Sequence, residues 1–387
     1  MKILLVSSSS GSRGGGEIFL KYLARGLVQR GHQIVSWCAQ HPRMNEFAAG
    51  QAELGQVVRS PYRNFYDYKT RILATCFNAA TSRRLAGEWA RLKPDVIHIN
   101  KQNLEDGLDL LRAADMLPTP SLSTIHITQS AAFLGARIAW LRDWLARRCL
   151  CAYQGPYVAV QETRRKELSD FLRNGHATRS IFNGVPMLAL DQRQAGRQSR
   201  RRELNVQDDQ LLVLDVGRME AQKRPMLFLE LAGRLHQRAP RARFVWIGDG
   251  SLTTQWDAWV AEHKLGHLIS RVGWQTDVKP FLFAADLFLH TAAYEGLPFA
   301  LIEAMSAGLP CAIPQDLARE ISVFSPQNVF FIENEDALDQ ALAQPARLQA
   351  KSAAARTLAA EHFSIEKMAS DYEHLYASLR QAPSAKR

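Results

Sequence analysis

The chain has 387 residues and carries 48 Lys and Arg against 38 Asp and Glu, a formal net charge of +10 at pH 7. Its content of 47% hydrophobic and 22% charged residues is typical of a globular protein and excludes a disordered chain. The cationic residues are spread along the sequence and form no basic arm, which disfavours a nucleic-acid-binding protein. Anionic ligands or a lipid surface remain as reasons for the charge.

The length and the cysteine content bound the organisation and the compartment. A chain of 387 residues exceeds one ordinary core, so two domains are expected. Five scattered cysteines without a C-x-x-C spacing indicate neither a disulfide framework nor a zinc site, and a reducing compartment fits best. The apolar start at residues 1–6 is too short for a signal peptide, and no apolar run is long enough to span a bilayer. We therefore expect a cytoplasmic protein.

The first half of the chain alternates strand-like and helix-like segments. Residues 2–7 (KILLVS) form an apolar run typical of a buried parallel strand, and a glycine-rich loop then leads into a helical pattern that Gly31 ends. Further strands are predicted at 33–39, 95–100, 121–127 and 157–161. Such alternation predicts a parallel sheet covered by helices.

The pattern breaks between residues 186 and 208, which are polar and basic and predict a linker that runs into a helix. The alternation then restarts, with strands predicted at 211–217, 243–250, 269–274, 286–292, 310–314 and 329–332, and with helix after about residue 347. Two α/β domains of similar build imply a cleft between them. Ligands of such sheets bind outside the carboxyl ends of the strands, so those ends are where we look for chemistry.

The first candidate site is the loop 7–17 (SSSSGSRGGGE) between the first strand and the first helix. Gly14, Gly15 and Gly16 allow close backbone approach to a ligand, and the helix N-terminus behind them favours an anion. Phe19 occupies the last position of a dinucleotide fingerprint, and no G-K-[ST] is present, so neither a dehydrogenase nor a P-loop is indicated. A phosphate-binding loop and a flexible serine-glycine turn both remain open.

The second candidate is a pair of cations, Arg218 and Lys223, in the loop after the strand 211–217. Two cations in one loop can clamp a diphosphate without a metal ion. Isolated cation pairs in loops are usually only solvated. The position at the carboxyl end of a strand favours the diphosphate site.

The third candidate is the stretch 293–305 (AYEGLPFALIEAM), in which two acids flank an apolar run. Pro298 suits the first position of a helix that reaches about Gly308, and the backbone N–H groups at its start would point at a phosphate. Glu303, about one and a half turns into the helix, can accept both hydroxyls of a ribose, whereas Glu295 would reach another part of the ligand. The donor-binding residues predicted at the helix start are Gly296, Leu297, Pro298 and Phe299.

Together these elements resemble glycosyltransferase family 4, whose members are retaining enzymes of the GT-B fold. The resemblance rests on the E-x7-E element, the R-x4-K pair and the glycine-rich first loop followed by the turn Arg30-Gly31-His32, in the expected order over the whole chain. It implies two Rossmann-like α/β/α domains that face each other across a deep cleft. Residues 1–185 would bind the acceptor and 209–362 the nucleotide sugar, with 186–208 as linker and entry helix, and 363–387 as a helix that packs back on the first domain.

The resemblance also implies roles for individual residues. His126, in STIHIT, matches the strand-end histidine that approaches the transferred sugar, while His98 is interpreted as structural. Gly15, with Gly16 beside it, would contact the donor phosphate. The remaining implied contacts are Arg218 and Lys223 with the diphosphate, Glu295 with the donor sugar and Glu303 with the ribose; Asn183 and Gly184 receive a supporting role. The segment 308–321 lacks the glycine pair of many members, which leaves the donor identity open.

The implied activity is a metal-independent, retaining glycosyl transfer of hexosyltransferase type. The donor would be a UDP- or GDP-sugar, and the acceptor a glycan, a lipid-linked sugar or a small molecule, in polysaccharide or glycoconjugate biosynthesis. The sequence contains no D-x-D and no histidine cluster with metal-ligand spacing, so neither metal nor cofactor is expected. A sugar-nucleotide epimerase, a phosphorylase and a non-catalytic nucleotide-sugar-binding protein remain alternatives.

Two segments of the first domain could contact the acceptor or the inner face of the membrane. Residues 59–72 mix four aromatic residues with four cations, and residues 136–149 form an amphipathic pattern with Trp140 and Trp144 on one face. The aromatic residues of the first segment are expected to pack inward somewhat more readily than to bind. For Trp140 and Trp144, packing in the core is the favoured interpretation. Weak attachment to anionic lipid fits the +10 charge.

Overall fold

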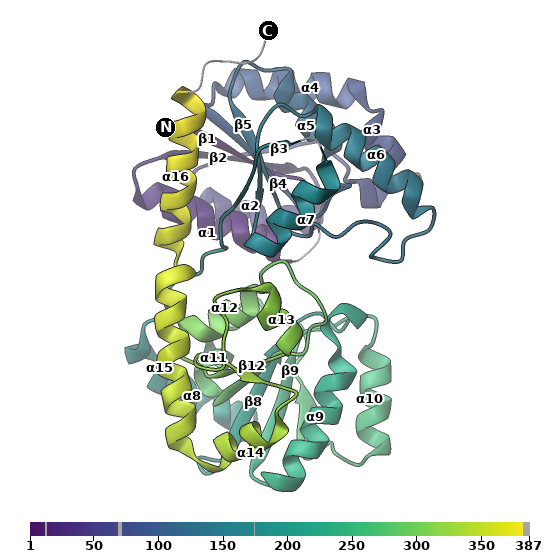
Figure 1. Ribbon diagram of the computed structural model, residues 1–387. Helices are drawn as coiled ribbons and strands as arrows, with labels where there is room; N and C mark the ends of the chain where they lie inside the picture. The colour runs from purple at the N-terminus through teal and green to yellow at the C-terminus, as the bar shows by residue number, and fades with distance from the viewer. Residues whose placement is uncertain (12–13, 69–71, 174, 382–387) are drawn as a thin grey trace. The chain divides into compact units, whose positions relative to one another are not determined.

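The computed structural model describes residues 1–11, 14–68, 72–173 and 175–381. Contacts along the chain divide it into two compact units, Met1–Gly184 with Ile365–Arg387, and Val185–Ser364. Each unit contains one parallel sheet with helices on its faces (Figure 1). The two units are described separately below.

The sheet of the first unit has seven parallel strands in the order β3-β2-β1-β4-β5-β6-β7. Because the order reverses between β1 and β4, the loops that follow these two strands diverge and leave room for a ligand at their carboxyl ends. The strands are β1 (Lys2–Ser7), β2 (Gln33–Ala39), β3 (Gln56–Ser60), β4 (Val96–Lys101), β5 (Ser121–Ile125), β6 (Tyr157–Ala159) and β7 (Thr178–Ser180). The helices are α1 (Gly15–Gln29), α2 (Asn45–Ala52), α3 (Ile72–Cys76), α4 (Ala79–Leu92), α5 (Leu108–Asp115), α6 (Ala139–Ala152), α7 (Glu162–Leu172) and α16 (Ile365–Gln381).

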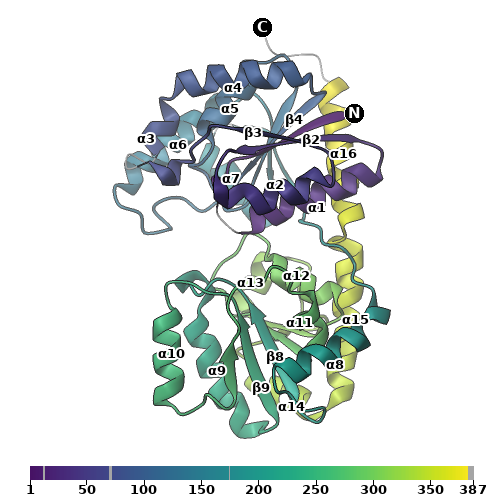
Figure 2. The same ribbon diagram turned by 180° about the vertical axis from the view of Figure 1, so that it is seen from behind.

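The helix α16 is tied into the first unit by buried aromatic residues. The Tyr376 hydroxyl lies 2.7 Å from His98 Nδ1, and the Tyr372 hydroxyl lies 2.8 Å from Thr124 Oγ1. The Tyr372 ring also meets the ring of Phe19 on α1 edge-on, with centroids 5.8 Å apart. Figure 2 shows α16 beside α1 from the opposite side to Figure 1. The last helix therefore completes the core of the unit in which the chain begins.

The sheet of the second unit has six parallel strands in the order β10-β9-β8-β11-β12-β13, so the order reverses between β8 and β11. The strands are β8 (Leu211–Val216), β9 (Ala242–Ile247), β10 (Ile269–Arg271), β11 (Leu287–Leu289), β12 (Cys311–Ile313) and β13 (Phe330–Phe331). The helices are α8 (Arg193–Glu203), α9 (Pro225–Arg238), α10 (Thr253–Glu262), α11 (Lys279–Ala284), α12 (Phe299–Ser306), α13 (Gln315–Glu320), α14 (Glu335–Ala343) and α15 (Pro345–His362).

The strands predicted from apolar runs are all present, but two strands and one helix start differ from the prediction. The edge strands β3 and β7 were not predicted, because β3 is half-exposed and β7 is a polar segment of three residues. Pro298 precedes the first helical residue of α12 as its N-cap, with φ −72° and ψ 112°, so its placement inside the helix was wrong by one position.

The prediction that Trp140 and Trp144 pack in the core is wrong, since they are 74% and 51% exposed. The buried residues of α6 are Leu145, Ala146 and Leu150 instead. In the segment 59–72, Tyr62 is buried whereas Tyr66 is exposed, and residues 69–71 lie outside the described residues. The aromatic residues of this segment therefore do not share one environment.

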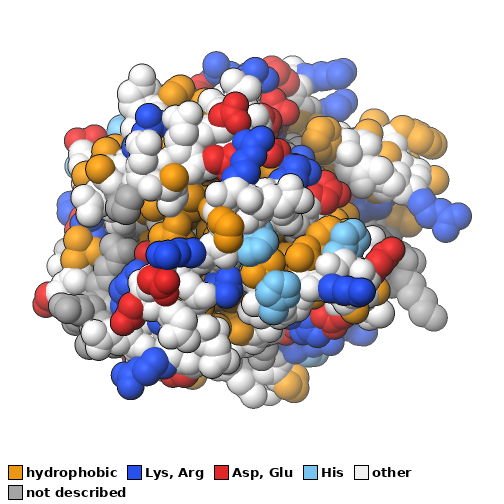
Figure 3. Space-filling model, turned by 90° about the horizontal axis from the view of Figure 1, so that it is seen from below, with side chains coloured by type: hydrophobic (Ala, Val, Ile, Leu, Met, Phe, Trp, Pro, Cys, Tyr) orange, Lys and Arg blue, Asp and Glu red, His pale blue; other side chains and the backbone are white. Residues whose placement is uncertain are grey.

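The structure also bears on membrane-spanning helices and on the distribution of the positive charge. None of the described helices combines the length and the apolar composition needed to cross a lipid bilayer. On the face of the molecule drawn in Figure 3, lysine and arginine side chains are interspersed with aspartate and glutamate and do not join into one basic patch. The positive charge is therefore not concentrated on that face.

Candidate functional site

The loop after β8, which carries Arg218 and Lys223, is held against the loop after β9 by backbone hydrogen bonds. Met219 N donates to Asp249 O at 3.0 Å, and Leu252 N donates to Met219 O at 2.9 Å. Gly248 has φ +129°, and a Cβ there would lie 2.2 Å from the carbonyl oxygen of Gly217. Only glycine fits such a close approach. The backbone of the loop that carries both cations is thus held in place by the loop after β9.

The same loop is joined to the loop after β11, which leads to Glu295. Gln222 Nε2 donates to Tyr294 O at 3.0 Å, and Ala293 N donates to Gln222 O at 2.8 Å. Thr291 Oγ1 donates to Lys223 O at 2.9 Å. The loops at the carboxyl ends of the neighbouring strands β8 and β11 are therefore joined by hydrogen bonds. Any ligand held by one loop is positioned relative to the other.

Arg224 adds a side-chain tie between these two loops. Its Nε donates to Thr291 O at 2.6 Å and its Nη2 to Ala292 O at 3.3 Å. Its backbone has φ +49°, a left-handed conformation that costs about 1–2 kcal/mol for a residue other than glycine. Burial lowers the pKa of its guanidinium, which Glu333 and Asp316 partly oppose. The sequence analysis did not identify Arg224, Gln222 or Thr291.

Lys223 Nζ forms an ion pair with Glu295 Oε1, and this contact is the central feature of the second unit. The two side chains are only 16% and 12% exposed. A half-buried ion pair is screened less than a surface pair, and each charge compensates the other. An ammonium group held in this way can exchange its carboxylate for an anionic ligand.

The other residues predicted in this unit, in the loop after β8 and at the start of α12, differ in their exposure. Arg218 is exposed. Hydrogen bonds from Ser251 lower the pKa of the Glu220 carboxyl, and the positive charge of Arg218 lowers it further. Glu303 is half-buried on α12, while the predicted segment 296–299 is buried at the start of that helix. The structure brings Lys223 and Glu295 together and leaves Arg218 at the surface.

In the first unit, His126 is joined to the first loop through Asn100. His126 Nε2 lies 2.7 Å from Asn100 Oδ1, and Asn100 Nδ2 donates to the carbonyl oxygen of Gly16 at 3.1 Å. His126 directly follows β5 and is 8% exposed, with its ring edge-on to Phe19 at 5.0 Å. Burial lowers its pKa to about 4, so the ring is neutral at pH 7. Because Oδ1 only accepts, Nε2 carries the proton and Nδ1 is an acceptor.

Gly15 and Gly16 begin α1 and differ in accessibility. Gly15 is exposed, whereas Gly16 is buried, and a Cβ on Gly16 would lie 2.1 Å from Gln102 Nε2. That amide nitrogen has no hydrogen-bond partner among the described residues. Gly14, the N-cap, provides no side-chain cap, so the exposed first turn can offer amides to an anion. Ser12 and Arg13 of the predicted loop lie outside the described residues.

Two residues at the end of β4, Asn100 and Gln102, thus contribute to this site although the sequence analysis did not select them. Their signal in the sequence is a pair of amide side chains at the carboxyl end of a predicted strand. His98, on the same strand, has both ring nitrogens engaged, Nδ1 with Tyr376 at 2.7 Å and Nε2 with Thr124 at 2.8 Å. This arrangement is that of a structural histidine.

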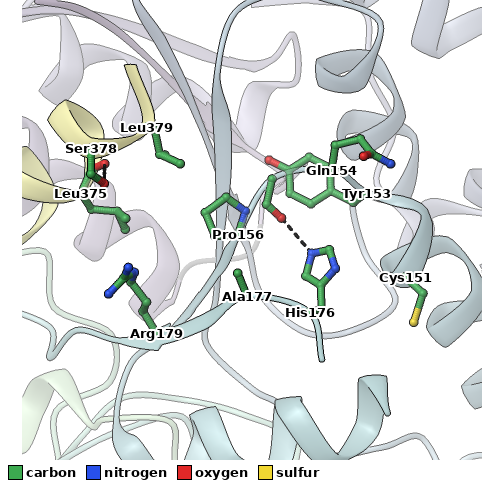
Figure 4. A pocket seen from close by; sticks show the side chains of 11 residues that line it. Cys151, Tyr153, Gln154, Pro156, His176, Ala177, Arg179, Leu375, Ser378 and Leu379 are labelled. Carbon is green, nitrogen blue, oxygen red and sulfur yellow. Dashed lines mark hydrogen bonds between the residues drawn. The ribbon is translucent and has the colours of Figure 1, made fainter. Parts of the chain in front are cut away.

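A cavity of about 400 Å³ in the first unit lies elsewhere (Figure 4). It is lined in part by Tyr153, His176, Arg179 and Ser378, and His176 Nε2 lies 2.9 Å from Gly155 O. Most of its lining residues lie in 151–156 and 176–177, directly before β6 and β7, which places the cavity at the amino ends of these strands. Ligands of parallel sheets bind at the opposite ends, so this cavity is separate from the candidate site.

Within the described part of the chain, no three His, Cys, Asp or Glu side chains are grouped so that they could hold a metal ion. The charged groups at the strand ends of the second unit include the Lys223–Glu295 pair, Arg224 and the exposed Arg218.

Comparison with known proteins finds a matching family model for each of the two units. The family model described as Glycosyltransferase Family 4 matches residues 13–187, and the model described as Glycosyl transferases group 1 matches residues 196–352. An *Escherichia coli* protein named UDP-Gal:alpha-D-GlcNAc-diphosphoundecaprenol alpha-1,3-galactosyltransferase is 32% identical over 124 residues, which are 31% of this chain and 32% of that protein. The chain thus spans about a third of the length of this relative.

Two further similarities extend over more of the chain. A protein of *Methanocaldococcus jannaschii* named uncharacterized glycosyltransferase MJ1607 is 23% identical over 322 residues, which are 81% of this chain and 80% of that protein. The crystal structure of *Anabaena* Alr3699/HepE in complex with UDP superimposes with a TM-score of 0.75 at 17% identity and covers 98% of this chain and 100% of that one. The chain therefore belongs to the family 4 glycosyltransferases and has the GT-B fold.

Proposed function

We propose that this chain is a retaining glycosyltransferase that needs no metal ion and transfers a sugar from a UDP-sugar to a lipid-linked or glycan acceptor. The E. coli relative is named for UDP-Gal and for an acceptor on diphosphoundecaprenol, and the Anabaena structure contains UDP. These names support UDP over GDP, and a lipid-linked acceptor over a small molecule. The single observation that supports the proposal most is the Lys223–Glu295 pair at the joined ends of β8 and β11.

In this proposal Lys223 and Arg218 stabilise the leaving diphosphate. The side chain of Lys223 is only 16% exposed, and its backbone carbonyl accepts a hydrogen bond from Thr291, so the lysine needs little reorganisation when the donor binds. When the diphosphate takes over Lys223, Glu295 gains an oxygen that accepts a hydroxyl of the donor sugar. Losing one preorganised donor of this kind costs on the order of 10²–10³ in rate.

Other residues contact the remaining parts of the donor. Glu303 accepts the ribose hydroxyls, and the exposed amide of Gly15 donates to a phosphate oxygen. His126 is neutral and accepts at Nδ1, so its role is to bind a sugar hydroxyl and not to supply a proton. Retention follows when the acceptor hydroxyl attacks the anomeric carbon on the face that the diphosphate leaves. The anomeric C–O(phosphate) bond breaks, the C–O(acceptor) bond forms, and a phosphate oxygen takes the proton.

Release of nucleoside diphosphate from a panel of UDP- and GDP-sugars, measured with and without a lipid-linked acceptor, tests this proposal. We expect UDP release that requires the acceptor, a product whose anomeric configuration matches the donor, and full activity in EDTA. Acceptor-independent change of the sugar would indicate an epimerase, and use of inorganic phosphate a phosphorylase. Donor binding without release would indicate a non-catalytic binding protein. Loss of turnover in EDTA would contradict metal independence.

A further inference from the structure

The first unit exposes a cluster of large apolar side chains on one short segment. Of the twelve large hydrophobic side chains that are exposed among the described residues, five lie between residues 133 and 144. They are Phe133 (63% exposed), Leu134 (41%), Ile138 (63%), Trp140 (74%) and Trp144 (51%). We refer to these five residues as the aromatic face. A cluster of this kind on a soluble unit marks a contact surface.

The loop that carries this face is held in a defined conformation. The carboxylate of Asp143 on α6 accepts hydrogen bonds from Ala131 N at 2.7 Å and Ala132 N at 3.2 Å. Leu134 N donates to Ser130 O at 3.1 Å within the same turn. Ile138, at the start of α6, has φ +50°, a conformation that is rare for a β-branched residue. The backbone is therefore fixed so that apolar side chains point away from the core.

The helix α6 continues the aromatic face and adds positive charge to it. Trp140, Trp144 and Arg148 are spaced four residues apart, so they share one side of the helix, and the Arg148 guanidinium lies 5.8 Å from the centre of the Trp144 ring. Arg137 is exposed in the turn before α6. The opposite side of the helix is buried in the unit. The exposed side thus combines tryptophan rings with arginine.

Two acidic residues in contact with α6 or its preceding loop, Glu105 and Asp143, are both engaged within the unit. Glu105 is held by Arg142 through two hydrogen bonds of 2.7 and 2.6 Å, and Asp143 accepts from the loop backbone. The exposed charges of the face are therefore those of Arg137 and Arg148. A surface with this charge complements an anionic partner.

The neighbouring helix α3 also carries exposed apolar side chains. Its residue Cys76 meets Cys149 of α6, with the two sulfur atoms 3.2 Å apart, and α3 and α6 lie side by side in Figures 1 and 2. Leu73 and Phe77, on and just after α3, are 41% and 73% exposed. Two adjacent helices thus each expose apolar side chains.

We propose that the aromatic face docks this protein on a lipid bilayer that contains anionic headgroups. Tryptophan rings and arginine side chains are the groups that favour the boundary between headgroups and acyl chains, because each combines an apolar body with a polar end. A protein partner of the same composition would need acidic groups opposite Arg137 and Arg148, which anionic headgroups supply over the whole surface. The inference does not depend on the proposed transfer, since it concerns binding to lipid alone.

Flotation of the full-length protein with vesicles of phosphatidylcholine, with and without phosphatidylglycerol, tests the proposal. We expect binding only to vesicles with phosphatidylglycerol and its loss in about 1 M salt, where the Debye length falls to about 3 Å. Replacing both arginines (Arg137→Gln with Arg148→Gln) should weaken binding about 30-fold, since each basic residue near an anionic surface contributes about fivefold. Trp140→Ala with Trp144→Ala should weaken it at least ~10-fold.

Matched controls distinguish binding through the aromatic face from a general attraction between a positively charged protein and anionic lipid. The first control changes Arg83 and Arg91, two exposed residues of α4, to Gln and so removes the same number of positive charges. The second control, Met116→Ala, removes an exposed apolar side chain elsewhere on the unit. These control variants should bind like the wild type. Equal weakening by the Arg83 and Arg91 variant would overturn the proposal, because the charge alone would then explain the binding.

A second readout reports insertion directly. Brominated lipids should quench the tryptophan emission of the wild type, and Trp140→Phe with Trp144→Phe should bind vesicles but lose most of that quenching. Persistent quenching in this variant would place another tryptophan in the bilayer and refute the assignment. Absence of vesicle binding, with a dimer that Trp140→Ala and Trp144→Ala convert to a monomer in sedimentation equilibrium, would show that the face binds a second copy instead.

Discussion

Replacement of Arg224 tests whether the tie between the two strand-end loops positions Lys223. The Arg224 guanidinium holds the carbonyl groups of Thr291 and Ala292, while its backbone remains left-handed at φ +49°. Two substitutions separate these features. Arg224→Ala removes the hydrogen bonds and keeps the unfavourable backbone, and Arg224→Gly removes the hydrogen bonds but adopts this backbone without strain.

The structure gives an expected magnitude for each variant. A hydrogen bond from a charged donor contributes about 1.5–3 kcal/mol, and the 3.3 Å contact adds little, so Arg224→Ala should destabilise the second unit by about 2 kcal/mol. Relief of the left-handed backbone returns about 1 kcal/mol in Arg224→Gly. For a unit of this size, 1 kcal/mol shifts the melting temperature by roughly 2–4 °C. The alanine variant should therefore melt lowest, with the glycine variant between it and the wild type.

Transfer should not follow this order of stability. Both variants lose the tie that holds Lys223, so both should lose transfer rate by a similar factor, about 10- to 100-fold, with little change in the KM for the donor. Lys264→Gly is the matched control, because Lys264 is exposed with φ +55° in the same unit; this variant should gain stability and keep its rate. The reasoning is refuted if Arg224→Gly regains rate together with stability, or if folded Arg224→Ala turns over normally.

Three other outcomes are expected. Lys223→Ala and Glu303→Ala should each abolish transfer, with a loss of at least ~10² in rate, and leave the circular dichroism spectrum unchanged; a folded Lys223→Ala protein of normal turnover would contradict the diphosphate site. Turnover should be unaffected by EDTA and by re-addition of Mg²⁺ or Mn²⁺, which a chelator titration checks. Burial lowers the pKa of His126 from 6.5 to about 4, so the unfolded chain takes up this proton first as the pH falls. The stability that His126 contributes is complete above about pH 6.5 and is lost toward pH 4 at about 1.4 kcal/mol per pH unit, and His126→Gln should remove this part of the slope in urea titrations.

The buried strands could be predicted because their signal is local. A parallel strand covered on both faces is a continuous apolar run, as in β1 and β8, and each of these was predicted at its observed position. The edge strands β3 and β7 carry no such run. Their formation depends on a neighbour far along the sequence, which offers hydrogen bonds to a segment of weak intrinsic preference.

The candidate site could be predicted in part, for a related reason. The positions of Arg218, Lys223 and Glu295 at strand ends follow from the alternation of strands and helices, since carboxyl ends of parallel strands share one edge. The pairing of Lys223 with Glu295 spans 72 residues and depends on the order of β8 and β11 in the sheet, which the sequence pattern does not reveal. Arg224 was missed because a left-handed arginine has no signature in composition or periodicity.

In the proposed function, the Lys223–Glu295 pair keeps a cation in position for the diphosphate of the donor. A lysine side chain that is only 16% exposed would turn toward water if it had no anionic partner, and this would weaken a preformed attraction for phosphate. The ion pair with Glu295 holds the ammonium in place, and the hydrogen bond from Thr291 to the carbonyl oxygen of Lys223 holds the lysine backbone. In that proposal the diphosphate bears more negative charge than the carboxylate it replaces, which favours the exchange. The site therefore needs no assembly before the donor arrives, and most of the cost of ordering it is met when the unit folds.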